Sequence, residues 1–586
     1  MPVGETDPTR IGRVKHVLGA TVTIALDPEM AGVSPIWQGR LQPVGQVGSI
    51  VRIPQGPVTL LAAVTLIGIA ELAGRLEPIA TPQVGERWLQ VQLLGEIDGL
   101  GRFNRGVSTY PGLDDPVHFT TADELRAVYP KPSETRVRLG RLAAAPTVPL
   151  TLDAQRLVVR HSAIVGSTGS GKSSAVASLV QGFLRGGWTN ANIIIVDPHG
   201  EYRLAFERPT AHVRSVLGTG EDLLAVPYWA LPAADILRGL TGIADPGATA
   251  TTRFAELVTD QRIEFANAAA WLALGPGEIS ADTPIPFDLR AVWYQLEYEN
   301  RATFSQAQGA GEPELEDAGD MESLRPPRFR PPEMGARAPF KGPRFGVMST
   351  VPDRLRAGLL DQRLEFFRQP PVAATDPDPL PNVLREWLGG TAAVSILDFS
   401  GVPAVATDLA IGVVLQLLFE AAIRGDEGGI GRHRPVLIVL EEAHRYLADA
   451  PSVRLARESV NRIAREGRKY GMGLMLVTQR PSELPETALA QVGTIVALRL
   501  TNGTDQSRVR AALPDSVAGL ADALPALRTG EALVVGEAIE LPTRVLIDMP
   551  VPAPAAADPT LGSWREAERV LDLTETVRRW RGGGAD

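Results

Sequence analysis

The sequence lacks cysteine altogether, and its few histidines are scattered. Without cysteine, disulfides and thiolate metal sites are excluded. The seven histidines do not show the spacing of metal ligands. No basic stretch followed by an apolar leader opens the chain, and we find no apolar run of transmembrane length. These absences predict a cytoplasmic protein with no membrane partner.

Length and composition predict several folded units with many turns. A chain of 586 residues has room for about two to four domains, and its 44% hydrophobic content is enough for a sizeable core. The 58 glycines and 48 prolines predict frequent turns and at least one flexible segment. The net charge of −10 does not suit a protein that coats itself with DNA. It does not exclude one that gathers positive charge on an inner surface.

A glycine-rich loop between a predicted strand and a predicted helix is the most informative motif. The apolar run 157–165 predicts a buried strand, and the next eight residues match G-x-x-x-x-G-K-[ST] at every fixed position. Glycines let the backbone turn its N–H groups toward an anion, at the positive end of the following helix. Lys172 can reach the β- and γ-phosphates of ATP, and the Ser173 hydroxyl suits Mg²⁺. The predicted nucleotide-binding residues are Gly166, Ser167, Thr168, Gly169, Ser170, Gly171, Lys172, Ser173 and Ser174.

Residues 1–150 have the pattern of a small β-barrel. Apolar residues alternate with polar ones around Val22, Ile24 and Leu26, and again around residues 89–93. Turn residues separate such runs at short intervals, which favours a barrel over βαβ units. The segment 58–69 predicts a fully buried strand or a strand pair. The unit contains no catalytic constellation, so we expect a structural or partner-facing role.

An α/β rhythm occupies residues 151–204 and returns at 391–550, which predicts one mostly parallel sheet built from both parts. The strand 193–196 ends in Asp197-Pro198-His199-Gly200-Glu201-Tyr202, where ligands bind in such sheets. We expect this strand to neighbour the P-loop strand. A plain strand-to-loop turn is the alternative interpretation.

Residues 205–390 predict a helical insertion between the two parts of the sheet. Helices are expected at about 252–274, 288–308 and 351–367. The polar stretch 309–346 cannot bury enough apolar surface to stay ordered alone, so we interpret it as a flexible linker without a role of its own. After the sheet, a linker begins at 551, and a last helix is expected at about 563–580, within a C-terminal segment 551–586.

Two further strand ends carry candidate catalytic groups. The apolar strand 436–440 ends in Glu441 and Glu442, a Walker B pattern. Glu441 is placed to hold the Mg²⁺ shell, and Glu442 to orient or deprotonate the water that attacks the γ-phosphate. Gln479 follows the strand 474–477 and suits a hydrogen bond to the γ-phosphate. Each of these could instead be an ordinary polar turn residue, but the P-loop favours the functional interpretation.

A basic helix is predicted between these two strands, at residues 453–469. It contains six positive and two negative side chains. Ion pairs of Arg462 with Glu458 and Glu466, each four residues away, would explain part of this charge as an ordinary solvent-exposed helix face. They account less well for Arg465, Arg468 and Lys469. These could meet a DNA backbone, or one of them could act as an arginine finger in a second subunit.

In combination, these motifs resemble the HerA family of hexameric DNA translocases, within the HerA/FtsK group of RecA-like ATPases. The resemblance covers nearly the whole chain. It rests on GSTGSGKSS, VDPHGEY, LEEAH, RIAREGRKYG and TQRPSELP followed by LRLTNGTDQ, in that order. It implies a RecA-like core, an N-terminal barrel on top of a ring, a helical insertion, and a C-terminal segment that braces the next subunit.

The resemblance also implies roles for individual residues. Lys172 and Ser173 bind nucleotide and Mg²⁺, Glu441 and Glu442 serve metal and water, and Gln479 senses the γ-phosphate. Arg468, or less readily Arg465, becomes the finger for the adjacent subunit, and Arg160 lies near the subunit boundary. One departure is Glu441, where aspartate is commoner; the carboxylate is kept, so activity is expected to survive.

Two functions remain open from the sequence. In the first, a homohexamer hydrolyses ATP, moves double-stranded DNA through its lumen and feeds a partner nuclease of the NurA type in DNA-end processing. In the second, the same ring is an ATP-gated scaffold that assembles a sirtuin-like NADase or nuclease effector in bacterial antiphage defence. Either partner is expected on the barrel face. Both functions use the same ATP site, so the sequence does not separate them.

Overall fold

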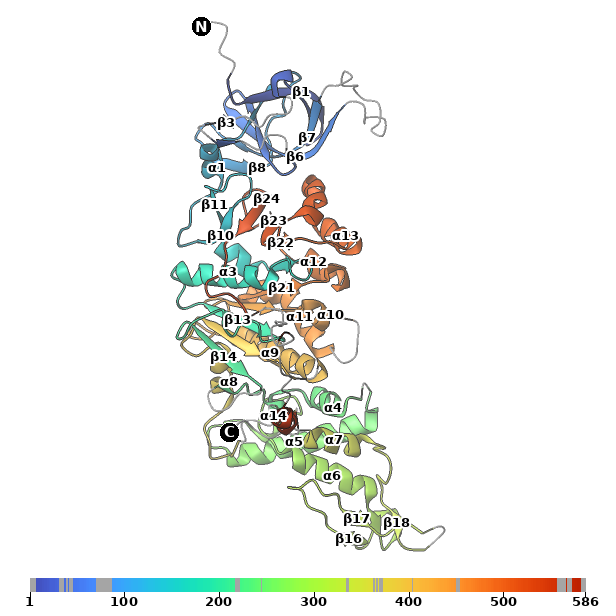
Figure 1. Ribbon diagram of the computed structural model, residues 1–586. Coiled ribbons are helices and arrows are strands. Elements are labelled where there is room, and N and C mark those ends of the chain that lie inside the picture. Colours follow the sequence, from blue (N-terminus) through green and yellow to red (C-terminus); the bar gives the residue numbers. More distant parts are fainter. Residues whose placement is uncertain are drawn as a thin grey trace.

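The computed structural model describes most of the chain as one elongated molecule. The described residues are 7–30, 36–37, 40–41, 46–69, 87–216, 222–243, 245–333, 337–361, 364, 367, 372–402, 404–448, 454–555, 565 and 572–580. Figure 1 shows a barrel at one end, a large sheet with helices in the middle and a helical insertion at the other end.

The N-terminal barrel is closed by six antiparallel strands. Its order is β2-β1-β9-β5-β6-β7, and β7 pairs back to β2, while β8 extends β7. The inward residues, among them Val22, Ile24 and Val91, are fully buried, which confirms the barrel and the alternation that predicted it. The strands are β1 (Arg10–Leu18), β2 (Thr21–Leu26), β5 (Ile50–Gln55), β6 (Val58–Ile69), β7 (Arg87–Ile97), β8 (Phe103–Arg105) and β9 (Pro116–Phe119), with a small hairpin β3 (Ile36–Trp37) and β4 (Arg40–Leu41).

The predicted barrel boundary at residue 150 is wrong. The barrel's last strand ends at Phe119, helix α1 (Ala122–Val128) follows, and β10 (Arg136–Leu142) and β11 (Pro149–Asp153) belong to the large sheet. β10 pairs with β24 (Thr543–Ile547), a strand that is distant in sequence. Sequence periodicity identifies strands but not the sheet that they join, and this caused the error.

The large sheet has eleven strands, most of them parallel. The parallel part runs β22-β12-β21-β20-β13-β19-β14, and β23, β24, β10 and β11 continue it as antiparallel strands. The predicted mostly parallel α/β sheet is therefore confirmed. Its remaining strands are β12 (Ser162–Val165), β13 (Asn192–Asp197), β14 (Ala211–Ser215), β19 (Val394–Asp398), β20 (Val436–Leu440), β21 (Met472–Thr478), β22 (Thr494–Leu498) and β23 (Glu531–Gly536).

Two expectations about this sheet are wrong. β13 does not neighbour the P-loop strand β12, because β20 and β21 lie between them. The predicted strand 157–165 is also shortened to β12. The Asp153 side chain accepts a hydrogen bond from the Arg156 N–H and starts helix α2 (Ala154–Val159), and His161, with φ 53°, turns the chain into the strand.

The sheet is buried on both faces, as its apolar strands require. In β20, Val436, Ile438 and Leu440 face one core, whereas Leu437 and Val439 face the other. Helix α3 (Lys172–Arg185) contributes to the second core, and α9 (Ala404–Arg424) and α11 (Arg454–Glu466) to the first. Other helices around the sheet are α10 (Ala443–Leu447), α12 (Glu486–Ala490), α13 (Gly503–Ala512) and the 3₁₀ helices η9 (Gly467–Tyr470), η10 (Pro481–Glu483) and η11 (Asp515–Ala526).

Helix α9 is long and apolar enough to cross a membrane by length and composition alone, which the sequence analysis overlooked. Its segment Ala406–Arg424 has a mean hydropathy of 1.7, and 72% of the tested window is buried inside the protein. The core helix of a globular protein meets the same criteria, so this is weak evidence for a membrane span. Among the described residues it is the one candidate.

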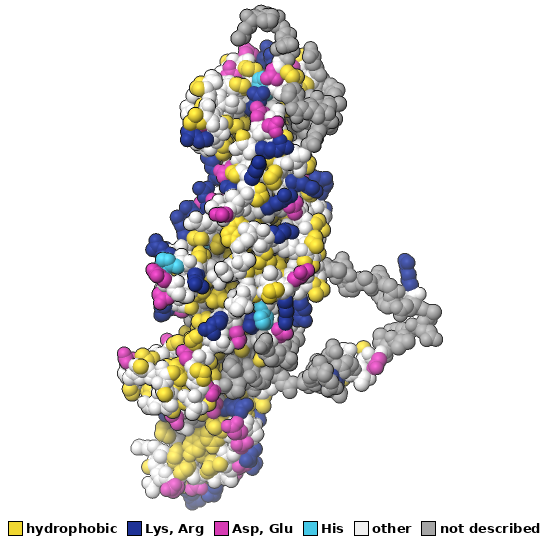
Figure 2. All heavy atoms as spheres, turned by 90° about the vertical axis from the view of Figure 1, so that its left-hand side faces the viewer, with side chains coloured by type: hydrophobic (Ala, Val, Ile, Leu, Met, Phe, Trp, Pro, Cys, Tyr) yellow, Lys and Arg dark blue, Asp and Glu magenta, His cyan; other side chains and the backbone are white. Residues whose placement is uncertain are grey.

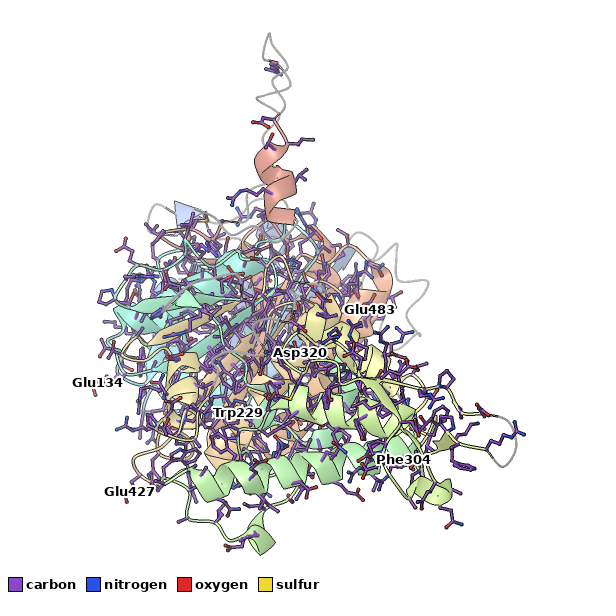
Figure 3. The ribbon with its side chains drawn as sticks, turned by 90° about the horizontal axis from the view of Figure 1, so that it is seen from below. Glu134, Trp229, Phe304, Asp320, Glu427 and Glu483 are labelled. Atoms are coloured by element: carbon purple, nitrogen blue, oxygen red, sulfur yellow. The ribbon has the colours of Figure 1, made fainter. Side chains whose placement is uncertain are left out.

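The insertion is helical, as predicted, and shares its core with one face of the sheet. The buried Arg262 side chain donates to the carbonyl oxygens of Trp229 (2.8 Å) and Leu231 (3.0 Å), which ties the insertion together. Trp229 is labelled in Figure 3. Burial lowers the pKa of Arg262 to about 10. The three predicted helices are shorter than expected: α5 (Ala248–Ala268), α6 (Leu289–Arg301) and α7 (Val351–Leu360). The insertion also contains α4 (Ala233–Thr241), α8 (Leu380–Trp387), η4 (Tyr228–Ala230), η5 (Pro276–Glu278) and η6 (Ala307–Gly309), which were not predicted, while η1 (Pro28–Met30) lies in the barrel.

The polar segment 309–346 contains regular structure, contrary to expectation. Its described residues, which exclude 334–336, include the strands β16 (Leu315–Asp317), β17 (Arg328–Phe329) and β18 (Phe340–Lys341). β16 pairs with β17, and β18 pairs with β15 (Thr303–Phe304). Its opposite charges pair, for example Arg325 with Asp317, but exposed pairs contribute only about 0–1 kcal/mol each. The edge-to-face contact of Phe329 with Tyr298, 5.0 Å between ring centroids, supplies an apolar anchor on α6.

At the C-terminus, the described part of the predicted last helix is α14 (Thr574–Trp580). The remainder of the predicted 563–580 helix, apart from residues 565, 572 and 573, lies outside the described residues. Seen from below in Figure 3, α14 stands clear of the main body.

The buried carboxyl group of Asp408 on α9 predicts a pH-dependent stability. Burial raises its pKa to about 6, and the nearest cation, on Arg445, is 4.0 Å away. Because the native state then holds a proton that the unfolded state releases near pH 4, the unfolding free energy contributed by this group falls between about pH 4 and pH 6. We expect Asp408→Asn to lose that decrease and to be more stable than wild type above pH 7.

The measurement is the thermal midpoint of both proteins between pH 4.5 and 7.5. Asp260→Asn, an exposed change on α5, is the matched control and should follow the wild type. Parallel curves for Asp408→Asn and wild type would contradict the prediction.

Candidate active site

The P-loop is a tight turn between β12 and α3. Gly169 and Gly171 have φ values of 71° and 102°, which an L side chain rarely adopts, so glycine is required at both positions. The loop is held to adjacent strand ends: the Gly166 N–H donates to the Thr478 carbonyl (3.2 Å) and the Ser167 N–H to that of Arg499 (2.9 Å). The loop is thereby fixed to strands β21 and β22 on either side.

The geometry of this loop suits a phosphate group. α3 begins at Lys172, so the first N–H groups of the helix lack intrahelical partners and carry the positive end of its dipole. The Ser170 hydroxyl is buried without a hydrogen-bond partner. The Lys172 ammonium lies 3.4 Å from the Ser167 carbonyl oxygen, at the loop itself. Several donors thus converge at the loop, as binding the phosphates of ATP requires.

Three glutamates oppose this positive charge. Burial lowers the pKa of Lys172, while the negative charges of Glu442, Glu441 and Glu201 act in the other direction. Glu441 directly follows β20 and is 6% exposed, and burial raises its pKa to about 8. Its carboxylate accepts a hydrogen bond from the Tyr202 hydroxyl. A cation in the site would favour the ionised form of Glu441.

The residues fit a Mg²⁺ ion bound together with nucleotide. Among the described residues no group of three or more histidine, aspartate or glutamate side chains is arranged to hold a metal by itself. Mg²⁺ usually takes only one or two carboxylates and completes its shell with phosphate oxygens and water. The predicted ligands supply such a partial set: Ser173 in the first turn of α3, and Glu441 directly after β20.

Glu442 has a backbone conformation that is unusual for a non-glycine residue. Its φ and ψ are 52° and 44°, in the left-handed region. A carboxylate oxygen of Glu442 lies 3.2 Å from Nδ1 of His444, which in turn is 3.1 Å from the Thr478 hydroxyl. Burial lowers the pKa of His444 despite the negative charge of Glu442. Backbone strain of this kind is commonly retained where a side chain must be aimed at a reacting group.

Gln479 also lies at the P-loop. Its side-chain oxygen accepts a hydrogen bond from the Thr168 hydroxyl, at 2.6 Å. β21 is adjacent to both β12 and β20, so its end lies between the P-loop and the Walker B carboxylates. Lys172, Ser173, Glu441, Glu442 and Gln479 are therefore gathered at the carboxyl-terminal edge of three adjacent parallel strands.

The two predicted arginines are not part of this group. Arg468 lies on η9, immediately before β21, and Arg160 lies before β12. Both are therefore at the amino-terminal ends of these strands, opposite to the P-loop. The seven residues of β21 span roughly 20 Å. Arg160 was expected on the P-loop strand, but it caps the end of α2 and pairs with Glu537 at 2.7 Å. Arg468 is exposed and has no ion-pair partner among the residues described.

Sequence reasoning missed three contacts of this site. Glu201 accepts a hydrogen bond from Ser173, Tyr202 donates to Glu441, and His444 adjoins Glu442. The signal for the first two was their position just after a buried parallel strand, which marked the segment as a ligand site but assigned no role to either residue. His444 could be found only from the turn geometry of Glu442.

A P-loop facing a pair of carboxylates across one intervening strand, with a polar residue at the tip of that strand, is the arrangement of a P-loop ATPase. The protein is an ATPase, and the predicted RecA-like P-loop core is confirmed.

Comparison with known proteins identifies the family. Two family models match, "Helicase HerA, central domain" over residues 137–331 and "Helicase HerA-like C-terminal" over 367–557. The chain belongs to the HerA helicase family, as the sequence motifs predicted. It is 26% identical over 493 residues to a "DNA double-strand break repair helicase HerA" of Pyrococcus furiosus, covering 78% of this chain and 76% of that protein. A protein of the same name from Sulfolobus acidocaldarius is 26% identical over 496 residues, with 84% of each chain covered.

Solved structures with a similar arrangement include VirB4 of Thermoanaerobacter pseudethanolicus, with 14% identity, a TM-score of 0.44, and coverage of 72% of this chain and 98% of that chain. The plasmid coupling protein TrwB in complex with the ATP analogue ADPNP has 14% identity and a TM-score of 0.42, and covers 73% of this chain and 92% of that chain. Likenesses at these scores support no further conclusion.

Removing the Lys172 ammonium should abolish ATP turnover. In Lys172→Ala the main side-chain cation facing the phosphates is lost, and we expect ATPase activity to fall by at least about a hundredfold, as for other removed groups that stabilise transition-state charge. Lys172 is on α3, and the barrel's own core contains no residue of this helix, so thermal stability and oligomeric mass should be unaffected. Steady-state phosphate release is the measurement, and Arg185→Ala, at the exposed end of the same helix, is the control. Full activity in Lys172→Ala would refute the site.

Proposed function

We propose that the protein forms a homohexameric ring that hydrolyses ATP to translocate double-stranded DNA. One observation carries the proposal: Lys172, Glu442 and Gln479 lie at the carboxyl-terminal ends of the parallel strands, whereas Arg468 lies at their amino-terminal ends. Relatives that match three quarters or more of both chains are named DNA double-strand break repair helicases, which supports DNA as the substrate. Location in the cytoplasm stays a prediction.

The roles of the residues follow from their positions. The P-loop N–H groups and Lys172 bind the phosphates, and Ser173 and Glu441 hold Mg²⁺, which when bound neutralises phosphate charge. Glu442 orients the attacking water and accepts its proton, and Nδ1 of His444 lies 3.2 Å from its carboxylate. Gln479, at the tip of the strand between them, reports the presence of the γ-phosphate to β21. Glu441 in place of aspartate keeps the carboxylate at this position.

The proposal requires a second subunit to complete the site. Arg468 lies about 20 Å from the ATP site of its own chain, and no side chain spans that distance. A neighbouring copy in a ring would present its Arg468 at the subunit boundary, where a guanidinium stabilises charge in the transition state. Arg160 already forms an ion pair with Glu537, so we assign it to the subunit boundary and not to the role of arginine finger. Helix α14, which stands clear of its own chain in Figure 3, is available to brace a neighbour.

The uneven surface charge is compatible with DNA as the partner. Although the net charge is −10, Figure 2 shows basic side chains gathered on the face that carries α1, β10 and β11, below the barrel, and mixed signs farther down. Contacts to phosphates without contacts to bases would hold DNA of any sequence. A partner nuclease on the barrel face, and the alternative of a defence effector there, stay predictions from the resemblance.

Arginine 468 should be needed in trans. We expect Arg468→Ala to bind nucleotide with wild-type affinity but to lose turnover by about 10³-fold or more, because only the transition-state contact is removed. Mixing Arg468→Ala with Glu442→Ala should restore part of the activity, since some interfaces then combine an intact Glu442 with an intact Arg468. Lys469→Ala, the adjacent exposed cation, should behave as wild type. Mixed rings, verified by native mass spectrometry, that recover nothing would exclude the finger.

DNA binding by the ring should be steeply salt-dependent and independent of sequence. For about six to ten phosphate contacts, affinity should fall roughly 10³–10⁵-fold between 50 and 200 mM salt, because bound counterions are released. Fluorescence anisotropy with two unrelated 40-base-pair duplexes is the measurement, together with triplex displacement as the readout of translocation. If the duplexes neither bind nor stimulate ATP hydrolysis, and no triplex is displaced, the proposed substrate is wrong.

A further inference from the structure

The carboxylate of Glu201 contacts the P-loop, although the P-loop motif does not include it. The Ser173 hydroxyl donates a hydrogen bond to Oε2 of Glu201 at 2.5 Å. Glu201 is half-buried, and it is one of the three negative charges that act on Lys172. Hydrogen bonds to a carboxylate are shorter and stronger than neutral ones, so this contact fixes the hydroxyl more firmly than a neutral acceptor would.

A rigid turn holds Glu201 in this position. The carboxylate of Asp197, at the end of β13, accepts hydrogen bonds from the N–H groups of His199 (3.2 Å), Gly200 (2.8 Å) and Tyr202 (2.9 Å). Gly200 has a φ of 72°, which favours glycine. The residues on both sides of Glu201 are thus hydrogen-bonded to Asp197. The turn therefore fixes the backbone of Glu201 without contacts from the P-loop.

The C-terminal end of the sheet domain supports the same turn from outside. We call residues 548–555 the strap. The Ala555 N–H donates to the Glu201 carbonyl at 2.7 Å. The buried Gln181 of α3 accepts from the Val551 N–H (2.9 Å) and donates to the Pro552 carbonyl (2.8 Å). The strap therefore bridges the P-loop helix and the Glu201 turn.

We propose that Glu201 is a positioning residue of the ATP site. A serine hydroxyl has a single hydrogen, and when Glu201 accepts it, the oxygen lone pairs of Ser173 are free to face a cation. The acceptor in the structure is Glu201 and not Glu441, whose Oε1 accepts the Tyr202 hydroxyl instead. Glu201 thus orients the hydroxyl that binds Mg²⁺ with the nucleotide, and the strap holds Glu201 in place through the Ala555 contact. The inference rests on the ATP site alone and not on DNA translocation.

The test measures how the affinity for nucleotide depends on Mg²⁺, with a fluorescent ADP analogue and no turnover. Partners that orient a metal ligand typically account for about 10–100-fold in metal affinity. We expect Glu201→Ala to raise the MgCl₂ concentration for half-maximal binding by that factor, with binding in EDTA unchanged. Glu201→Gln keeps the side-chain size and an acceptor oxygen and should show a smaller shift in the same direction. Glu207→Ala, exposed on the following turn, should leave the curve unchanged.

A double-mutant cycle separates positioning from a merely structural role. In the Ser173→Ala background no hydroxyl remains to be oriented, so adding Glu201→Ala should have no further effect. An additive effect, or a loss of binding in EDTA as well, would show that Glu201 only supports the turn and would overturn the proposal. Unchanged Mg²⁺ dependence in both Glu201→Ala and Glu201→Gln would also overturn it.

The contribution of the strap has its own variant. Ala555→Pro removes the N–H that donates to Glu201 and also fixes φ at residue 555. Loss of one such hydrogen bond corresponds to a shift of roughly two- to tenfold. We expect the Mg²⁺ requirement to rise by that amount in wild type and not at all in Glu201→Ala. The same shift in both backgrounds would contradict the assigned role of the strap.

Discussion

The length of the parallel strands is the constraint on which the rest of the structure depends. Strands β12, β20 and β21 bring Lys172, Glu442 and Gln479 together at their carboxyl-terminal ends, and Arg468 lies at the amino-terminal end of β21. A strand of seven residues spans roughly 20 Å, which is farther than an arginine side chain reaches. A single chain therefore brings its P-loop, its Walker B carboxylates and Gln479 together, but it holds its own Arg468 at the opposite ends of the strands. In the proposed function, a second copy supplies that guanidinium.

The sheet also joins the two ends of the molecule into one packed body. Leu61 of the barrel lies in the same buried cluster as α3, and the insertion residues Trp229 and Trp293 lie in the same cluster as α9. Nucleotide binding at the P-loop thus occurs between two continuous cores, one reaching the barrel and the other the insertion. Interiors packed at this density transmit small displacements, so changes at the site have a physical route to both ends.

Local patterns in the sequence were enough to predict the P-loop, the alternating strands of the barrel and the buried strands of the large sheet, because strand periodicity and the fixed glycines depend on neighbouring residues only. They did not predict sheet order: β20 and β21 separate β13 from β12, and β10 joins the large sheet and not the barrel. They also failed where short-range polar contacts decide, as at Asp153, which starts α2, and in 309–346, where charges pair within the segment. The contact between Ser173 and Glu201 joins two distant turns, and only the folded chain reveals it.

The most direct test of the central claim is the specific ATPase activity of the wild-type chain as a function of its own concentration, with particle mass measured at each point by mass photometry. If each pocket depends on a neighbour, activity per chain should fall together with the fraction of hexamers and approach zero for single chains. Full activity per chain in a solution of monomers would contradict the account.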